Sequence, residues 1–398
     1  MNQEWREARA AMMLDPEVTY LNTGSYGILA RAVFERVTAL RGAMTRNPVD
    51  FLWRRQGPEL LWRARDRLAQ FLHVDPRRLV FTQNVSVSIN VVAASLCLAS
   101  PGEVLLTDHE YGAMRYVWER SAQRQGLTLR TVQLPEPARD GAQLIDAITS
   151  AFRPATRLLQ ISHIFYTTGT IVPLREICAE ARRRGILTVV DGAHAPGMIP
   201  LNLPELQCDF YGANLHKWFC APVGAGFLYA APGQEDRLQP LHISWGWHYD
   251  RSRPDERDEF GGTPRLRSFE FEGSRDITPW LVVPECIELI AGIGLSAIRQ
   301  RHQSLSDHVR RRLREIPGLH QATADHPELR GGITAYRVGP VNLPLIRRIL
   351  HEEHRIEVNV IEALAGNYLR VSTHFYNDEA EVDRLATMLP EALARASQ

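Results

Sequence analysis

Two residues suited to carbonyl and acid–base chemistry occur beside apolar runs that we expect to form strands. Lys217 stands between His216 and Trp218 and precedes a glycine-rich turn. A lysine that forms a Schiff base needs a sheltered setting of this kind, although most lysines are solvated surface residues. Asp191 ends the apolar run 187–190. A carboxylate there either keeps a pyridine nitrogen protonated or caps the next turn.

A third polar segment, residues 82–86, lies between an expected strand and an apolar helix. Asn84 or Ser86 can cap that helix, and free N–H groups at its start can hold a phosphate. Taken alone, the segment favours an ordinary helix cap. Ligands of open α/β sheets bind at the carboxyl ends of the strands, which is where all three segments are expected.

Strands and helices alternate from about Asp75 onward, and this alternation predicts an α/β fold with a mainly parallel sheet. The expected strands are 78–82, 103–107, 127–133, 157–162, 186–190, 210–213 and 226–229, with helices at 86–98, 114–125, 144–152 and 174–184. Charged residues crowd 248–266, which we interpret as an exposed excursion or a linker. An α+β part follows, with helices at 279–293, 296–316, 343–353 and 378–394 and strands at 331–338, 357–361 and 368–372.

Bulk properties argue against several classes of function. The 398 residues include 46 Lys+Arg and 46 Asp+Glu, and this zero net charge gives no reason to expect nucleic acid or an anionic membrane surface as a partner. There is no apolar run of about 18 residues and no apolar signal core near Met1, so we expect a cytoplasmic protein. The five cysteines are dispersed and form neither a disulfide framework nor a metal motif.

Short motifs spread over nearly the whole chain point to one family. They are 21–27, 84–86, 107–113, 191–196, 216–217, 244–247, 271–276, 370–372 and 376–377. In these motifs and their order the chain resembles the fold type I, pyridoxal 5'-phosphate (PLP) enzymes of aminotransferase class V. Within that class it resembles the isopenicillin N epimerases of antibiotic biosynthesis.

The resemblance implies a definite domain organisation. A large PLP-binding domain with a mainly parallel seven-stranded sheet is expected at 21–265, and a smaller α+β domain at 266–398. Residues 1–20 are expected to form an N-terminal arm that packs on the smaller domain.

The resemblance also implies a role for each residue of a cofactor site. Lys217 forms the Schiff base and moves protons at the substrate Cα. Asp191 pairs with the pyridinium nitrogen, Tyr111 stacks on the ring, and His194 contacts the phenolic oxygen. The residues near the phosphate are Val85, Ser86, Asn214, His216 and Ser274. Ser274 resembles a contact donated by the second subunit, so a homodimer is implied.

On the substrate side, Arg370 falls where the class binds the α-carboxylate of an amino acid, a task that suits its fork of donors. Tyr26 and Tyr166 are further substrate-binding candidates. Epimerisation needs a second acid on the opposite face of Cα, and Tyr26, Tyr166 and His242 stay open for that role. The apolar run 245–247 either walls the substrate or packs in the core.

We therefore expect a PLP-dependent epimerase that inverts the α-carbon of an amino-acid moiety, such as that of isopenicillin N. Cysteine desulfurases carry a nucleophilic cysteine shortly before the carboxylate-binding arginine. No cysteine lies between Cys286 and Arg370, which argues against desulfuration. A C–S lyase or an aminotransferase would use the same lysine, aspartate and arginine and stays open. A non-catalytic PLP-fold binding protein is the alternative from another class.

Overall fold

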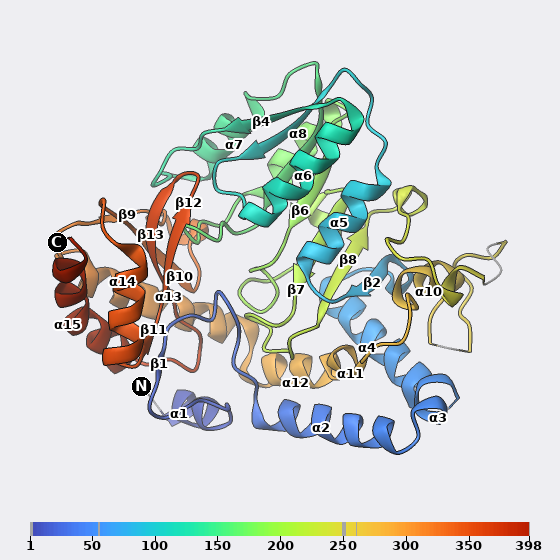
Figure 1. Ribbon diagram of the computed structural model, residues 1–398, viewed down its shortest axis with the longest axis horizontal. Helices are drawn as coiled ribbons and strands as arrows, with labels where there is room; N and C mark the ends of the chain where they lie inside the picture. The colour runs from blue at the N-terminus through green and yellow to red at the C-terminus, as the bar shows by residue number, and fades with distance from the viewer. Residues whose placement is uncertain (1–2, 55, 249–251, 260, 398) are drawn as a thin grey trace.

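A seven-stranded sheet lies at the centre of the computed structural model, which describes residues 3–54, 56–248, 252–259 and 261–397 (Figure 1). The strand order is β2-β8-β7-β6-β5-β3-β4. Neighbours pair in parallel except at β8, which runs antiparallel to β2 and β7. The bounds are β2 Leu79–Thr82, β3 Glu103–Thr107, β4 Thr128–Val132, β5 Thr156–Ser162, β6 Leu187–Asp191, β7 Phe210–Asn214 and β8 Gly226–Ala230. The expected α/β fold with a mainly parallel sheet is confirmed.

Helices cover both faces of this sheet because alternate strand residues point to opposite sides. Val104 and Leu106 belong to one apolar cluster with α5 and α6, whereas Leu105 belongs to another with α7 and α8. These helices are α5 Val85–Ser95, α6 Gly112–Gln125, α7 Gly141–Thr149 and α8 Leu174–Arg183. Shorter segments are α9 Leu203–Leu206, α10 Pro264–Glu270 and the 3₁₀ turns Pro76–Arg78, Glu235–Arg237 and Trp245–His248.

Three helices near the N-terminus were not foreseen from the sequence. They are α2 Arg31–Arg46, α3 Pro48–Trp53 and α4 Gln56–Leu72, and they follow the short α1 Gln3–Ala10. In α4, Leu61, Leu68 and Leu72 are buried at helical spacing. Arginines interrupt that pattern, and the buried one, Arg65, is neutralised by a residue far along the chain. The sequence alone does not show this compensation.

A four-stranded antiparallel sheet in the order β12-β13-β10-β9 forms the C-terminal part of the chain. Its strands are β9 Leu319–Gln321, β10 Ile333–Val338, β12 Asn359–Ala363 and β13 Gly366–Ser372. Its helices are α13 Leu295–Leu313, α14 Leu343–Arg348 and α15 Glu379–Ala396, with a π turn at Ile349–Glu353 and a 3₁₀ turn at Pro327–Leu329. The α+β character expected here is present; the domain boundaries at 20 and 265 stay a prediction.

Two expected elements are divided in the structure. The helix expected at 279–293 is α11 Thr278–Leu281 followed by α12 Val283–Ile293, because Pro284 lies in the first turn of α12 and favours a new helix start. The strand expected at 357–361 is β11 Ile356–Glu357 and then β12. β11 pairs with the N-terminal β1 Thr19–Tyr20, whereas β12 pairs with β13.

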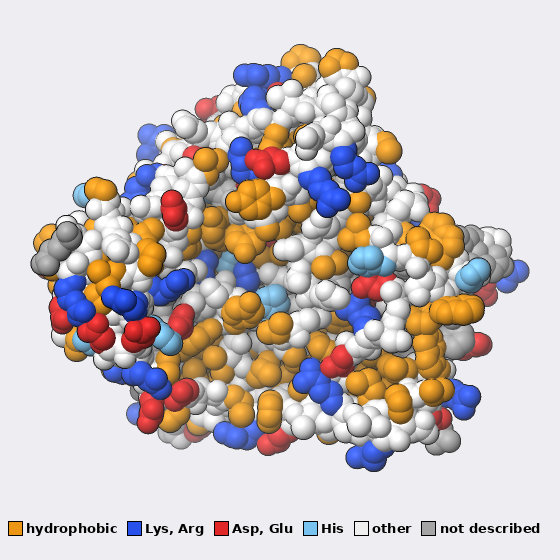
Figure 2. Space-filling model, in the orientation of Figure 1, with side chains coloured by type: hydrophobic (Ala, Val, Ile, Leu, Met, Phe, Trp, Pro, Cys, Tyr) orange, Lys and Arg blue, Asp and Glu red, His pale blue; other side chains and the backbone are white. Residues whose placement is uncertain are grey.

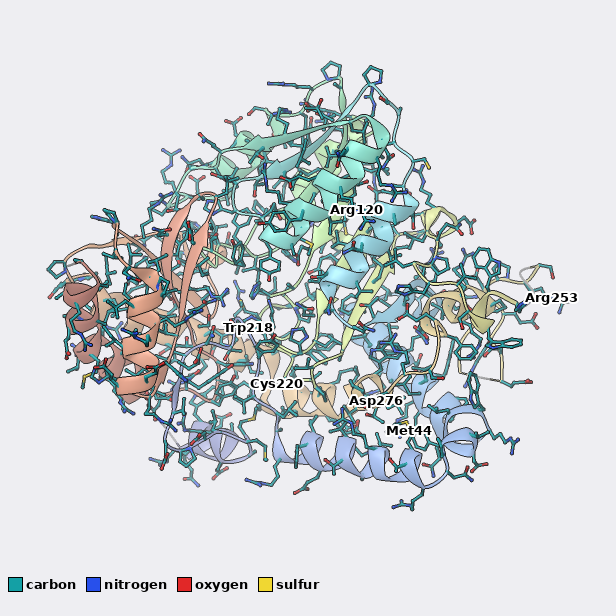
Figure 3. The ribbon with its side chains drawn as sticks, viewed as in Figure 1. Met44, Arg120, Trp218, Cys220, Arg253 and Asp276 are labelled. Atoms are coloured by element: carbon teal, nitrogen blue, oxygen red, sulfur yellow. The ribbon has the colours of Figure 1, made fainter. Side chains whose placement is uncertain are left out.

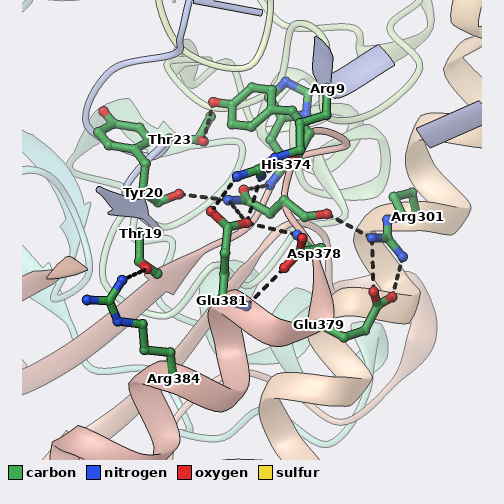
Figure 4. A network of polar contacts seen from close by, with 12 residues as sticks. Arg9, Thr19, Tyr20, Thr23, Arg301, His374, Asp378, Glu379, Glu381 and Arg384 are labelled. Carbon is green, nitrogen blue, oxygen red and sulfur yellow. Dashed lines mark hydrogen bonds and ion pairs between the residues drawn. The ribbon is translucent and has the colours of Figure 1, made fainter. Parts of the chain in front are cut away.

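A buried polar network ties the N-terminal segment to the loop after β13 (Figure 4). Arg9 donates to Glu381 Oε2 at 3.0 Å and to the carbonyl of Tyr376. The Asn377 side-chain amide donates to the carbonyl of Tyr20 at 2.8 Å and to Glu381 at 3.0 Å. The network therefore holds the segment after β1 beside the end of β13.

The charged stretch 248–266 is exposed over most of residues 252–259, as expected for an excursion, whereas residues 261–263 and 266 are buried; residues 249–251 and 260 lie outside the described ones. It is more than a linker, since Arg257 pairs with Glu59 at 3.1 Å and Asp258 with Arg267 at 2.7 Å. In the part of the chain that the structure describes, no single helix has the length and apolar character to cross a membrane. One pair, Thr278–Ile293 with Leu295–Leu313, passes only jointly and is bent by 71°.

The buried pair of Arg65 and Glu270 gives a test of this architecture. Arg65 donates to both Glu270 oxygens, at 2.7 and 2.6 Å, and neither side chain is more than 6% exposed. Glu270→Gln leaves the guanidinium uncompensated, and we expect urea denaturation to show a loss of about 3 kcal/mol in the free energy of unfolding. Glu353→Gln, which breaks the exposed pair with Arg395, should change it far less. Equal losses would contradict the assignment.

Candidate active site

A cavity of about 740 Å³ opens where the carboxyl ends of β5, β6 and β7 face the four-stranded sheet, and Figure 2 shows the hollow between them with basic and histidine side chains inside. Ser162, Asp191 and Asn214 end the three strands, and β13 contributes Arg370 from the other side. The cavity brings together the expected residues Tyr26, Val85, Ser86, Tyr111, Tyr166, Asp191, His194, Asn214, His216, Lys217 and Arg370.

Lys217 is half-buried at the floor of the cavity, with its Nζ 3.3 Å from His194 Nε2. Burial and the positive charge of Arg370 lower the pKa of the Lys217 amine to about 7, against the opposing pull of Asp191. Much of the amine is therefore uncharged near neutral pH, as a nucleophile requires. Lys217 is also the only lysine in the sequence. That fact marks it as special independently of the motifs around it.

The backbone around Lys217 is held at close quarters by Gly27. The Gly27 N–H donates to the His216 carbonyl at 2.8 Å. A Cβ on Gly27 would lie 1.9 Å from the Lys217 carbonyl oxygen, so only glycine allows this approach. The segment after β1 thus packs directly on the lysine loop.

Asp191 is buried at the end of β6, and its Oδ1 accepts the Ala193 N–H at 2.9 Å. Burial raises the pKa of its carboxyl, while the Ala193 N–H and the charge of Lys217 act in the opposite direction. A buried carboxyl in this position gains from a cationic partner in the cavity. Asp191 therefore suits a protonated ring nitrogen.

Glu110 is a second buried carboxyl that the sequence interpretation missed. It accepts hydrogen bonds from the hydroxyls of Thr107 at 2.8 Å and Ser162 at 2.6 Å. Burial raises its pKa to about 8, and the charge of Asp191 adds to the rise. Glu110 is therefore largely protonated at neutral pH, which leaves Asp191 as the ionised member of this buried pair of carboxyls. Glu110 lies within the matching motif 107–113. Its place just after a strand, however, suggests only a side chain that caps the following turn.

The start of α5 offers backbone donors to an anion. Asn84 caps this helix through the Val87 N–H at 3.0 Å, and Asn214 Oδ1 accepts the Val85 N–H at 2.9 Å. The first-turn N–H of Ser86 has no intrahelical acceptor, as at any helix start. His216 Nδ1 is buried without a hydrogen-bond partner among the described residues. The Ser86 N–H and the His216 ring nitrogen are the groups left to meet a phosphate here.

Arg370 is a buried cation with neutral partners. Its guanidinium donates to the Tyr166 carbonyl at 3.0 Å, to Asn22 Oδ1 at 3.3 Å and to Ser25 Oγ at 3.2 Å. Burial lowers its pKa to about 10, so it stays charged at neutral pH. It forms no ion pair with any carboxylate in the described chain. Since a buried unpaired charge is costly, the site gains from an anionic ligand such as a carboxylate.

Four tyrosines line the cavity: Tyr26, Tyr111, Tyr116 and Tyr166. Tyr111 and Tyr166 meet edge-on with ring centroids 5.2 Å apart, and Tyr26 lies 5.5 Å from the His216 ring. Burial raises the pKa of Tyr166 to about 12, so its hydroxyl keeps its proton. Tyr26 and Tyr111 are about half exposed, at 54% and 47%.

Some expected residues do not reach the cavity of their own chain. Ser274 lies in a separate cleft beside Trp53 and Trp280. His242 is exposed and bonds Glu272 at 2.8 Å, so within one chain it is not the second acid. Residues 245–247 do not line the cavity. They lie in a 3₁₀ turn in which Gly246 is buried against Arg267, whereas the Trp245 and Trp247 side chains are 71% and 37% exposed. None of the described lining residues is a cysteine.

Comparison with known proteins agrees with this geometry. The family model described as Aminotransferase class-V matches residues 40–385. The chain belongs to the aminotransferase class V family. Among relatives of this class V chain, the isopenicillin N epimerases of Streptomyces clavuligerus and Amycolatopsis lactamdurans are 50% and 48% identical to it, each over 97% of this chain and 98% of their own length.

Solved structures also match this class V protein. Two structures of the cystine C–S lyase C-DES are 27% identical, have a TM-score of 0.81, and cover 94% of this chain and 97% and 98% of their own. One carries glycine covalently linked to its PLP cofactor, and the other holds the product cysteine persulfide. The fold is therefore that of the PLP enzymes.

Glu110 gives a pH-dependent prediction. The unfolded chain loses this proton near pH 4.5, whereas the folded protein keeps it up to about pH 8. Between these values the folded state binds more protons, so the free energy of unfolding falls as pH rises, by up to about 1.4 kcal/mol per pH unit. Glu110→Gln should remove this part of the slope in urea denaturation from pH 5 to 8. The exposed control Glu176→Gln should keep it, and a wild-type slope in Glu110→Gln would mean that Glu110 is ionised when folded.

Proposed function

We propose that this protein is a PLP-dependent epimerase that inverts the α-carbon of an amino-acid moiety, with isopenicillin N or a close analogue as substrate. The observation that carries the proposal is the near-complete coverage of two isopenicillin N epimerases at 50% and 48% identity. Two features of the cavity support it: the Lys217 amine has a pKa of about 7, and the Arg370 guanidinium has no carboxylate partner among the described residues.

The residues of the cavity fit PLP. Lys217 would hold the cofactor covalently, Asp191 would pair with its ring nitrogen, and Tyr111 would cover the ring. His194 would meet the phenolic oxygen. The phosphate would bind at the start of α5, near Val85, Ser86, Asn214 and His216. When bound, PLP withdraws electrons from the substrate α-carbon and so acidifies its proton.

The proposed assembly is a homodimer with shared sites. Ser274 lies outside the cavity of its own chain, in the cleft with Trp53 and Trp280. We assign it to the phosphate of the second subunit's site, as the class V pattern implies. A homodimer would also cover part of the half-exposed Tyr26 and Tyr111.

The chain's own groups account for proton transfer at Cα. Arg370 fixes the α-carboxylate and so sets which face of Cα meets Lys217. The Lys217 amine, with a pKa of about 7, is free to take the Cα proton at neutral pH. Inversion then needs an acid on the other face. We assign it to Tyr166, whose hydroxyl stays protonated and whose carbonyl contacts the carboxylate-binding Arg370.

Incubation of the holoenzyme with isopenicillin N in deuterated water tests the function. We expect inversion at the aminoadipyl α-carbon with uptake of one deuterium there, and no exchange in Lys217→Ala. Release of pyruvate and ammonia from a cysteine derivative would instead identify a C–S lyase, and conversion to a keto acid an aminotransferase. A protein that never binds PLP would contradict the proposal altogether.

Tyr166 is tested by separating exchange from inversion. Tyr166→Phe should lower the rate of inversion by about 10²–10⁴-fold, the usual contribution of a positioned acid. It should keep deuterium exchange with retention, because Lys217 acts on its own face. Tyr26→Phe is the matched comparison, and loss of inversion in that variant alone would assign the second acid to Tyr26.

A further inference from the structure

Trp218 follows the lysine in sequence but lies in the packed junction between the two sheets (Figure 3). It is fully buried, and its indole Nε1–H donates to His194 Nδ1 at 3.2 Å. The other ring nitrogen of the same histidine, Nε2, lies 3.3 Å from Lys217 Nζ. His194 therefore stands between an indole and the lysine amine, with one nitrogen facing each.

This arrangement determines the tautomer of His194. An indole N–H only donates, so Nδ1 must be the unprotonated nitrogen. Burial and nearby positive charges hold the pKa of His194 well below its usual value, so the ring is neutral and carries one proton. That proton is on Nε2, the atom that faces Lys217.

We propose that Trp218 is a positioning residue that fixes His194 as the Nε2–H tautomer, so that the ring presents a donor to the Lys217 amine and to a cofactor oxygen beside it. The contact of His194 with a cofactor oxygen rests on the proposed function. The effect on Lys217 is a property of the chain itself, because a donor facing the amine favours its neutral form.

The packing keeps the indole in place. A Cβ on Gly332 would lie 2.4 Å from an atom of the Trp218 ring, and one on Gly197 would lie 2.3 Å from the Trp218 carbonyl oxygen, so both backbones press on this residue. His374 Nε2 contacts the same carbonyl oxygen at 3.0 Å, and the His302 ring meets the indole edge-on at 5.3 Å. These contacts from several segments hold the indole in one orientation, with its N–H directed at His194 Nδ1.

Trp218→Phe removes the donor and keeps an aromatic ring and every backbone contact. His194 is then free to carry its proton on Nδ1, which leaves Nε2 as an acceptor that favours the ammonium form of Lys217. We expect the pKa of Lys217 to rise by about one unit. A purely structural role for Trp218 would not move this value.

Because the chain has one lysine, apoenzyme labelled with ¹⁵N at the lysine Nζ gives a single side-chain signal that can be titrated directly by NMR. Trp118→Phe is the matched control, since Trp118 is equally buried and its N–H bonds Gln160 at 2.8 Å, away from His194. The proposal predicts a raised pKa in Trp218→Phe and the wild-type value in Trp118→Phe. Equal values in all three proteins would overturn it.

A second measurement reads the tautomer in the wild-type protein and so does not depend on the folding of Trp218→Phe. Histidine ¹⁵N signals of the wild-type apoenzyme, with His194 identified by its loss in His194→Gln, distinguish the two tautomers. A proton on Nε2 supports the proposal, and a proton on Nδ1 overturns it. Both readouts use protein without cofactor, so they stand apart from any failure of the epimerase assay.

Discussion

Two cationic side chains share one buried cavity, and this constraint governs the rest of the site. Burial, and then the charge of Arg370, make the ammonium form of Lys217 costly, so the amine gives up its proton near neutral pH. Arg370 keeps its own charge because the Tyr166 carbonyl, Asn22 and Ser25 solvate it in place of water. The fold thereby obtains a nucleophile and an anion receptor from burial in the same cavity.

Keeping these charges together requires segments that are distant in sequence. Arg370 lies on β13, Lys217 follows β7, and the solvating groups Asn22 and Ser25 come from the segment after β1. That segment would have to detach for Arg370 to lose Asn22 and Ser25, two of its three partners. The network around Arg9, the parallel pairing of β1 with β11, and the Gly27 contact on Lys217 all resist such a movement.

The part of the site that could be predicted from the sequence consists of reactive side chains at or just after the ends of strands. Lys217 and Asp191 follow apolar runs, and the alternation of elements places such ends at one edge of a sheet. The sequence did not reveal groups whose role depends on contacts between distant loops. The Trp218–His194 hydrogen bond is of this kind, as is the protonated Glu110 behind Asp191.

The fold shows the same division. The sheet follows from periodicity, whereas α4 escaped notice because a buried Arg65 breaks its apolar pattern and its partner Glu270 lies far along the chain. The division of the expected strand 357–361 was not predictable either. Nothing in its sequence indicates that its first residues pair with β1 and the later ones with β13.

The single lysine also determines where aldehydes can react with this protein. Every other cationic side chain that is fixed in charge is an arginine, whose guanidinium remains protonated and does not form Schiff bases with simple aldehydes. Apart from the terminal amine, the chain therefore offers sugars, fixatives and cross-linkers a single amine, and that amine lies in a cavity. Such a surface resists Schiff-base glycation by sugars and cross-linking through lysine, and a protease specific for lysine would find one cleavage position in these 398 residues.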